Sequence, residues 1–325
     1  MTRLGVIGAG AWGTALAQVT ATGGKVLLWA FEPDVAAAIN DTHANPLYLP
    51  GVALSPQVRA TERVEDMADC EALLVVTPAQ HMRSILRSME VGSRPLLLCA
   101  KGIEAGTMAL MSEVAAEICP KAPIGVLSGP TFAAEVAAGL PTAVTLACAD
   151  DDVGERLARR IALPGFRPYR STDVAGAEIG GAVKNVLAIA SGVVEGAGLG
   201  RNARAALIAR GFAEMTRFGL ARGARAETLA GLSGLGDLVL TCSSEQSRNF
   251  SLGLGLGRGV PAPILLADRR TVAEGAFTAP VLAEAARLAG IEMPIVDAVA
   301  ALLAGTNDVR AVIDRLLARP LRIEA

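Results

Sequence analysis

Residues 4–13 read LGVIGAGAWG, an apolar run followed by glycines in the spacing Gly-x-Gly-x-x-Gly. The run Leu4–Ile7 predicts a buried strand, and the residues after the glycines predict a helix. Gly8 permits the tight turn between them, Gly10 lets a pyrophosphate approach the backbone, and Gly13 lets the helix pack closely on the strand. The helix N-terminus adds free amides and a favourable dipole for an anion. We therefore predict a dinucleotide-binding turn, the alternative being a tight structural turn without a ligand.

Glu32 occupies the position at which dinucleotide-binding sites of this kind have an acidic residue. It lies nineteen residues after Gly13, at the end of a second apolar run over Lys25–Ala30. A carboxylate at this position accepts hydrogen bonds from a ribose diol and repels a 2′-phosphate. The alternative is that Glu32 caps the helix expected to begin near Pro33.

The first half of the chain alternates short apolar runs with amphipathic segments. Strands are predicted at Leu4–Ile7, Lys25–Ala30, Ala72–Thr77, Pro95–Ala100, Pro123–Ser128, Thr142–Cys148 and Phe166–Arg170. Helices are predicted at Trp12–Thr20, Asp34–Asn40, Gln80–Met89, Met108–Cys119, Thr131–Ala138 and Val153–Leu163. Near-continuous apolar strands separated by helices are typical of a parallel sheet covered on both faces. The predicted fold class is therefore α/β, with a doubly wound parallel sheet of Rossmann type.

The second half has a different pattern, because strand-like runs stop after about Ser171. Ala/Leu-rich helices are predicted at Ala175–Glu195, Ala203–Phe218, Ala224–Leu229, Ser244–Gly255, Val281–Leu288 and Pro294–Leu303. We expect two domains, a dinucleotide-binding domain over residues 1–175 and an all-helical substrate domain over residues 176–325.

Composition excludes several classes of protein. Thirty basic and 32 acidic residues leave a formal net charge of −2, without the basic face that general nucleic-acid binding needs. Aromatic residues make up 3%, too few for base-stacking platforms. Five cysteines without a CxxC pair indicate reduced, mostly buried thiols and a cytoplasmic protein. Two histidines, with no HExxH or Cys/His spacing, predict no metal site.

The N-terminus needs a separate test for a signal or anchor. Twenty-one uncharged residues separate Arg3 from Lys25, which is long enough for a membrane helix. Six of the 21 are glycines, and each weakens a helix by about 1 kcal/mol. We therefore expect a folded strand, turn and helix here, and no membrane span.

Three motifs follow predicted strands of the first half, where ligands bind in such folds. The first is the turn over residues 76–80, VTPAQ, in which Pro78 suits a helix start. The second is Lys101, whose ammonium suits a phosphate-bearing ligand although a surface lysine is the usual alternative. The third is residues 128–131, SGPT, where Gly129 and Thr131 offer amides and a hydroxyl, or form an ordinary turn.

Lys184 lies in the most informative stretch of the second half. Residues 180–186 read GGAVKNV within an apolar segment that runs uncharged to Glu195. Burial there lowers the pKa of a lysine toward the working pH, so Lys184 could give or take a proton, unless it reaches the surface. Asp237, in a glycine-rich turn, could pair with Lys184 or cap the next helix. Residues 247–249, SRN, offer a hydroxyl, a guanidinium and an amide, or form a solvated helix face.

Taken in order, these motifs resemble the bacterial NAD(P)-dependent sn-glycerol-3-phosphate dehydrogenase family. The resemblance covers nearly the whole chain. It rests on GAGAWGTALA at 8–17, AKGIE at 100–104, SGPTFAAEV at 128–136, GGAVKNVLAIASGVVEG at 180–196, GLGDLVLTC at 234–242 and SRNFSLG at 247–253. It implies reversible hydride transfer between a nicotinamide dinucleotide and carbon 2 of glycerol 3-phosphate, giving dihydroxyacetone phosphate. The reducing direction would supply glycerol 3-phosphate for phospholipids.

The resemblance also implies roles for individual residues. Lys184 would be the general base for alcohol oxidation and the acid for ketone reduction, with Asp237 beside it. The substrate would contact Lys101, Gly129, Thr131, Lys184, Asp237, Ser247, Arg248 and Asn249. The cofactor would contact Gly8, Gly10, Ala11, Trp12, Gly13, Phe31, Glu32, Lys101, Ala133, Arg248, Val272 and Glu274.

The chain departs from the family pattern at two places. The family often has a basic residue after the Trp-Ala of the second strand, whereas residues 29–32 read WAFE. With no cation for a 2′-phosphate, we expect NADH to be used at least as well as NADPH. The segment TVAEGAFTAP also differs from the commoner form, which bears on Val272 and Glu274.

Alternatives remain open at this stage. Another two-domain dehydrogenase, acting on a hydroxy acid or ketopantoate, fits the first half equally well, although the combined Lys184, Asp237 and 247–249 pattern disfavours it. A dinucleotide sensor without turnover is a second alternative, which a desolvated lysine facing a cleft disfavours. The apolar helices lead us to expect a homodimer.

Overall fold

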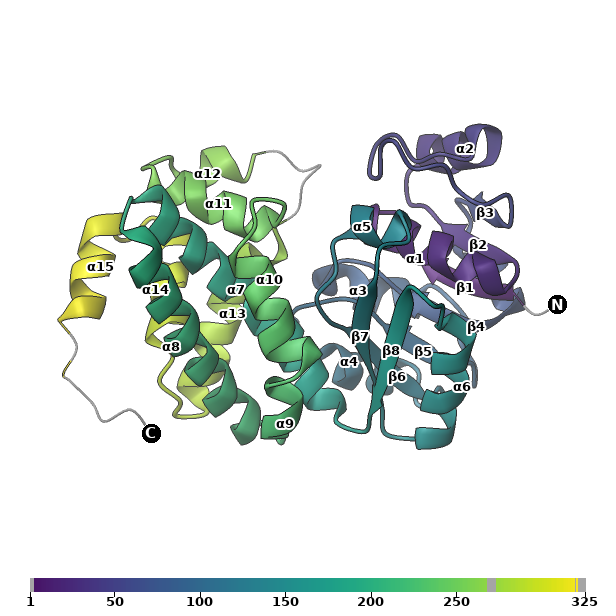
Figure 1. The fold of residues 1–325 in the computed structure, drawn as a ribbon. Coiled ribbons are helices and arrows are strands. Elements are labelled where there is room, and N and C mark those ends of the chain that lie inside the picture. The colour runs from purple at the N-terminus through teal and green to yellow at the C-terminus, as the bar shows by residue number, and fades with distance from the viewer. Residues whose placement is uncertain (1–2, 268–272, 319, 321–325) are drawn as a thin grey trace.

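The computed structural model describes residues 3–267, 273–318 and 320. A sheet-based half and a helical half lie side by side (Figure 1). The strands are β1 (Arg3–Ile7), β2 (Val26–Trp29), β3 (Val58–Thr61), β4 (Cys70–Val75), β5 (Leu96–Leu98), β6 (Ile124–Ser128), β7 (Thr142–Cys148) and β8 (Phe166–Ser171). They form one eight-stranded sheet in the order β3-β2-β1-β4-β5-β6-β7-β8. The α/β fold class with helices in the second half is confirmed.

The sheet corrects two sequence expectations. Strand β3 is absent from the predicted set because it lies at the sheet edge, where residues alternate between buried and exposed instead of forming an apolar run. The sheet is also not wholly parallel, since β7 runs antiparallel to β6. Between them, the chain forms only the short helix α5 (Ala133–Ala137) before it turns back, so it makes no long crossover.

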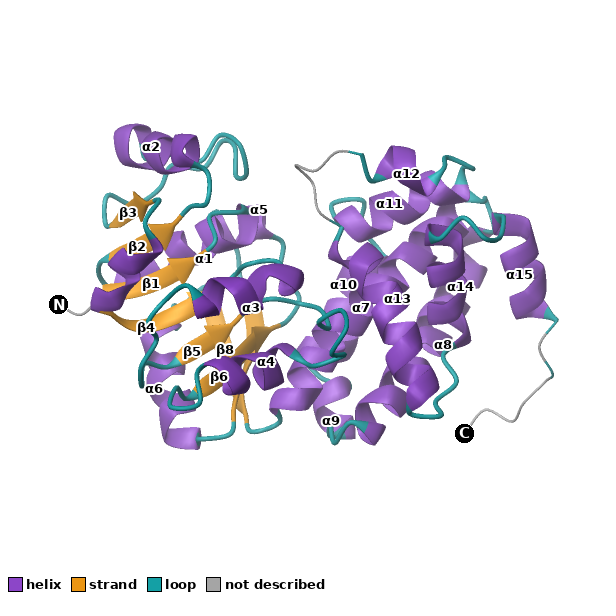
Figure 2. Ribbon diagram, turned by 180° about the vertical axis from the view of Figure 1, so that it is seen from behind, coloured by secondary structure: helices purple, strands orange, loops and turns teal. Residues whose placement is uncertain are grey.

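Both faces of the sheet are covered, as Figures 1 and 2 show from opposite sides. One apolar cluster joins the sheet to α1 (Ala11–Thr20), α2 (Pro33–Thr42) and α6 (Asp151–Ile161). The other joins it to α3 (Ala79–Arg87) and α4 (Met111–Ile118). Because alternate side chains of one strand enter opposite clusters, the central strands are apolar at successive positions.

The helical half is built around α7 (Val174–Gly196), in which every residue from Gly176 to Val194 is buried. Its other helices are α8 (Gly200–Ala221), α9 (Ala226–Leu229), α10 (Asp237–Cys242), α11 (Arg248–Gly257), α12 (Ala262–Leu265), α13 (Glu274–Leu288), α14 (Pro294–Leu303) and α15 (Val309–Leu317). Among the described helices, α7 alone is long and apolar enough to cross a membrane, and its apolar window is wholly buried within the protein. Its composition is that of a central core helix.

Glycines let α7 and α11 approach to backbone contact. A Cβ atom built on Gly192 would lie 2.0 Å from the Phe250 carbonyl oxygen, and one built on Gly253 would lie 1.9 Å from the Ile189 carbonyl oxygen. No side chain fits at either position without separating the helices. The alignment of α11 on α7 therefore depends on these glycines.

We expect Gly253→Ala to destabilise the protein by about 1–3 kcal/mol, the usual effect of overpacking, despite the better helix propensity of alanine. The thermal unfolding midpoint, followed by circular dichroism, measures the loss. Gly154→Ala is the matched control, because its Cβ in α6 would meet side-chain atoms alone, Cys148 Cβ at 3.2 Å and Leu146 Cδ2 at 3.9 Å. Equal midpoints for the two variants would contradict the close-packing explanation.

Candidate active site

The glycine-rich turn forms a cradle at the carboxyl end of β1. Gly8 has φ +111°, and a Cβ atom there would lie 2.9 Å from the Val76 carbonyl oxygen. A Cβ on Gly13 would lie 1.8 Å from the Gly8 carbonyl oxygen, so α1 packs directly on the turn. A Cβ on Gly10, by contrast, would have no atom within 4 Å. The open side of Gly10, at a helix N-terminus without a side-chain cap, fits the pyrophosphate of a dinucleotide.

The carboxyl end of β2 lies next along the sheet. The Glu32 side chain does not cap α2; its carboxylate instead accepts a hydrogen bond from the Tyr48 hydroxyl at 2.8 Å. The Phe31 side chain is 77% exposed and meets the Trp29 ring edge-on, at a centroid distance of 6.3 Å. An exposed aromatic ring beside a held carboxylate matches what an adenosine needs, a stacking surface and an acceptor for its ribose.

Asp237 joins two lysines from different parts of the chain. Its Oδ1 accepts from Lys184 Nζ at 2.5 Å, and its Oδ2 accepts from Lys101 Nζ at 2.6 Å. Thr241 Oγ1 accepts a second hydrogen bond from Lys184 Nζ at 2.9 Å. The structure therefore shows the pairing alternative for Asp237, and adds Lys101 to the pair.

Asp237 and Lys184 are removed from water, whereas the Lys101 side chain is 15% exposed. Asp237 is fully buried, and Lys184 is 6% exposed. Burial lowers the pKa of Lys184 to about 8, helped by the Lys101 charge and opposed by the Asp237 carboxylate. An amine with this pKa exchanges a proton near neutral pH, as a general acid or base must.

Two glycines of α7 explain how these groups meet. A Cβ on Gly180 would lie 2.4 Å from the Ser233 carbonyl oxygen, so the turn that precedes Asp237 rests on the α7 backbone. A Cβ on Gly181 would lie 3.3 Å from Lys101 Cγ, so the Lys101 stem crosses the same helix. The pair of glycines thus brings the helical half against the end of β5.

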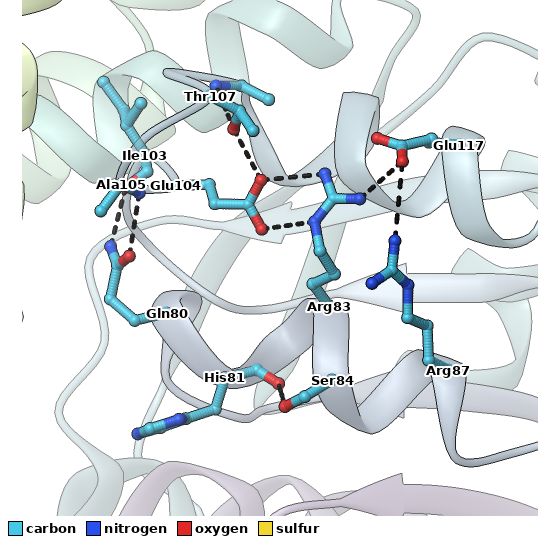
Figure 3. Close-up of polar contacts among 11 residues, drawn as sticks. Gln80, His81, Arg83, Ser84, Arg87, Ile103, Glu104, Ala105, Thr107 and Glu117 are labelled. Carbon is cyan, nitrogen blue, oxygen red and sulfur yellow. Dashed lines mark hydrogen bonds and ion pairs between the residues drawn. The ribbon is translucent and has the colours of Figure 1, made fainter.

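Helix α3 holds the loop after Lys101 (Figure 3). Gln80 donates to the Ile103 carbonyl at 2.8 Å and accepts from the Ala105 amide at 2.9 Å. Arg83 binds both carboxylate oxygens of Glu104, at 2.8 and 2.9 Å. These hydrogen bonds hold the pKa of the buried Glu104 carboxyl below its usual value. The loop that begins with Lys101 is therefore fixed to the end of the sheet.

Further predicted residues lie near the carboxyl ends of the strands. Trp12, Lys101, Gly129 and Thr131 line one small pocket. Among the described residues, the buried hydroxyls of Ser128 and Thr77 find no hydrogen-bond partner. Ala133 begins α5, and Ala11 begins α1.

The three residues of the motif at 247–249 make different contacts. Ser247 caps α11 by accepting from the Phe250 amide at 3.3 Å. Asn249 is buried and links two helices: it donates to Asn185 Oδ1 at 3.0 Å and accepts from the Gly275 amide at 2.9 Å. Arg248 is exposed between them, so the solvated-face alternative describes only this one side chain.

Glu274 faces the lysines from the start of α13. Burial raises the pKa of its carboxyl to about 7, while the charges of Arg248, Lys101 and Lys184 oppose that rise. Glu274 therefore lies within electrostatic reach of residues predicted for both ligands. Val272, its predicted companion, lies outside the described residues.

Sequence reasoning gave no role to Thr241, Tyr48, Gln80 or Arg83, although Gln80 ends the VTPAQ turn singled out from the sequence. Thr241 had a local signal, because it lies one helical turn after Asp237 and so shares its face. The other three act through contacts with distant segments. Among the described residues, no group of three or more His, Cys, Asp or Glu side chains is placed to hold a metal ion.

Two models of one protein family match most of this chain. The family model described as NAD-dependent glycerol-3-phosphate dehydrogenase N-terminus matches residues 3–154, and its C-terminus counterpart matches residues 173–314. A glycerol-3-phosphate dehydrogenase [NAD(P)+] from Erythrobacter litoralis is 63% identical over 99% of this chain and 98% of its own. One from Caulobacter vibrioides is 58% identical over 99% of both chains.

A solved structure agrees with these relatives. The glycerol-3-phosphate dehydrogenase of Coxiella burnetii superimposes with a TM-score of 0.94 at 37% identity, covering 98% of this chain and 99% of that one. The matches extend across both the sheet-based and the helical half. The chain therefore belongs to the NAD-dependent glycerol-3-phosphate dehydrogenase family.

Proposed function

We propose that this chain transfers hydride reversibly between NAD(P) and carbon 2 of sn-glycerol 3-phosphate, with Lys184 moving the proton. The observation that carries the proposal is the buried Lys184 ammonium, held by Asp237 and Thr241. The proposed domains are residues 1–175 for the cofactor and 176–325 for the substrate. In the reducing direction the product would serve phospholipid synthesis.

Different residues of the chain would bind the pyrophosphate, the adenosine and the nicotinamide of the cofactor. Gly8, Gly10 and Gly13 shape the pyrophosphate cradle, with Ala11 and Trp12 at the start of α1. Phe31 and Glu32 receive the adenosine. The nicotinamide end is assigned to Lys101, Ala133, Arg248, Val272 and Glu274. When bound, the nicotinamide ring supplies or accepts the hydride.

Lys184 has the geometry of the acid and base. In reduction its ammonium gives a proton to the oxygen on carbon 2, and in oxidation the neutral amine takes that proton back. Asp237 and Thr241 fix Nζ in place through two hydrogen bonds, leaving the third N–H position for the substrate oxygen.

The substrate phosphate is assigned to the cationic side of the same crevice. Lys101 Nζ already donates to Asp237 at 2.6 Å and to the Gly129 carbonyl at 3.4 Å, which leaves one N–H for a phosphate oxygen. Gly129, Thr131 and Arg248 supply further donors. Ser247 and Asn249 shape this wall through the helix cap and the link to Asn185.

We also propose a cytoplasmic homodimer. All five cysteines are buried and free, as in proteins of a reducing compartment. Helix α13 leaves Phe277 and Leu288 more than half exposed, a surface that a second copy would cover. Light scattering at several concentrations measures the mass in solution.

We expect Lys184→Ala to lower the rate of dihydroxyacetone phosphate reduction by about 10²–10⁴, the usual contribution of a positioned proton donor. Loss of absorbance of the reduced nicotinamide follows the reaction. Lys121→Ala is the control, because that lysine is exposed. Nearly full turnover by Lys184→Ala would show that another group moves the proton.

The reaction should depend on pH through Lys184, whose pKa is about 8. Reduction needs the ammonium, so kcat should fall as the pH rises through this value, whereas oxidation needs the amine and should rise. Lys101→Ala removes a charge that lowers the pKa of Lys184, so the inflection of the pH profile should move to higher pH.

The Lys101→Ala variant should also raise KM for dihydroxyacetone phosphate. An unchanged KM would remove Lys101 from the phosphate site.

NADH should serve at least as well as NADPH, because Glu32 repels a 2′-phosphate and residues 29–32 contain no cation. The measurement compares kcat/KM for the two cofactors with dihydroxyacetone phosphate in excess. A strong preference for NADPH would disprove the role given to Glu32. Absence of turnover with both, by a folded protein that binds cofactor, would disprove the proposed function itself.

A further inference from the structure

The segment from His43 to Leu49 connects the phosphate and ribose ends of the dinucleotide crevice. It leaves α2 at His43, which has φ 48°, and returns across the glycine-rich turn. Asn45 and Leu49 form an isolated antiparallel bridge that closes the segment into a compact loop. Tyr48 lies within this loop, so its position depends on how the loop is anchored.

Asn45 provides that anchor. Its side chain is fully buried, and its Nδ2 donates to the Ala9 carbonyl and to Thr14 Oγ1, both at 2.8 Å. Its Oδ1 accepts from the Tyr48 amide at 3.1 Å. Ala9 stands between Gly8 and Gly10, so one amide side chain ties the loop to the phosphate cradle. A side chain with only donors or only acceptors cannot make all three bonds.

Anchored in this way, Tyr48 holds the Glu32 carboxylate. The Tyr48 hydroxyl donates to Glu32 Oε1 at 2.8 Å, which leaves Oε2 to accept from a ribose hydroxyl. The donor is neutral, so the negative charge of Glu32 remains. No Lys, Arg or His side chain forms an ion pair with Glu32 within residues 3–267, 273–318 and 320. The hydroxyl thus fixes the carboxylate in position without neutralising its charge. A lysine or arginine partner would fix it but would also neutralise it.

We propose that Tyr48, positioned by Asn45, is a specificity-determining residue that favours NADH over NADPH by holding Glu32 toward the adenosine ribose. This inference rests on the proposed function, in which Glu32 receives that ribose. Without the hydroxyl, the half-buried Glu32 side chain gains freedom to rotate toward water. It would then bind the ribose diol less well and meet a 2′-phosphate with less repulsion. Tyr48 is a positioning residue, since it acts through Glu32.

The test measures kcat/KM for NADH and for NADPH in four proteins: the wild type, Tyr48→Phe, Glu32→Gln and the double variant. Tyr48→Phe should lower the NADH-to-NADPH ratio about three- to tenfold, less than the full contribution of a hydrogen bond to a charged group, because Tyr48 acts on the ribose only through Glu32. The change should fall on KM, with kcat little altered, because the bond is remote from Lys184. Tyr169→Phe makes the same change at the other tyrosine, which is exposed on β8, and should leave the ratio unchanged.

The double variant separates positioning from a general structural effect. If Tyr48 acts through Glu32, adding Tyr48→Phe to Glu32→Gln should change the ratio no further. An unchanged ratio in Tyr48→Phe, together with a lower ratio in Glu32→Gln, would overturn the inference about Tyr48 and leave the role of Glu32 intact. An unchanged ratio in Glu32→Gln would overturn both.

Glu32→Asp tests the same bond from its other end. It keeps the charge but shortens the side chain by one methylene, so the carboxylate no longer reaches the Tyr48 hydroxyl. The ratio should fall as it does in Tyr48→Phe. A ratio equal to that of the wild type would show that charge alone discriminates, and would overturn the inference even if Tyr48→Phe did not fold.

Discussion

The buried carboxylate of Asp237, bound by Lys101 and Lys184, is the interaction on which the two halves of this protein depend. Lys101 comes from the end of the sheet, whereas Lys184 and Asp237 come from the helical half. Removing one partner from such a cluster leaves an uncompensated buried charge, so each group needs the others. Two cations and one anion also leave a net charge of +1, which suits a phosphate-bearing substrate.

Close backbone packing is what makes that cluster possible. The glycines of α7 bring the turn before Asp237 and the stem of Lys101 onto one helix, and the glycines farther along α7 bring α11 close enough for Asn249 to reach Asn185. The absence of a side chain at these glycines therefore has a chemical consequence. It places polar groups from separate segments within hydrogen-bonding distance inside an otherwise apolar core.

The charged groups have different partners at the two ends of the proposed site. At the reacting end, cations flank a buried acid, and desolvation brings the pKa of Lys184 to about 8. At the ribose end, a neutral hydroxyl holds Glu32 and preserves its charge. The first arrangement serves proton exchange and anion binding. The second serves discrimination, because only an unneutralised carboxylate repels a phosphate.

The sequence by itself determined the dinucleotide turn, the doubly covered sheet, the change to helices after Ser171 and the desolvation of Lys184, because spacing and periodicity record local conformation and burial. It did not reveal strand β3, whose edge position leaves it half exposed, or the reversed direction of β7. Nor did it reveal that Lys101 shares Asp237 with Lys184, that Asn249 serves as a link between helices, or that Tyr48 and Asn45 support Glu32. These features depend on which distant segments meet, and only the tertiary structure decides that, since a local pattern shows that a side chain is buried but not what it is buried against.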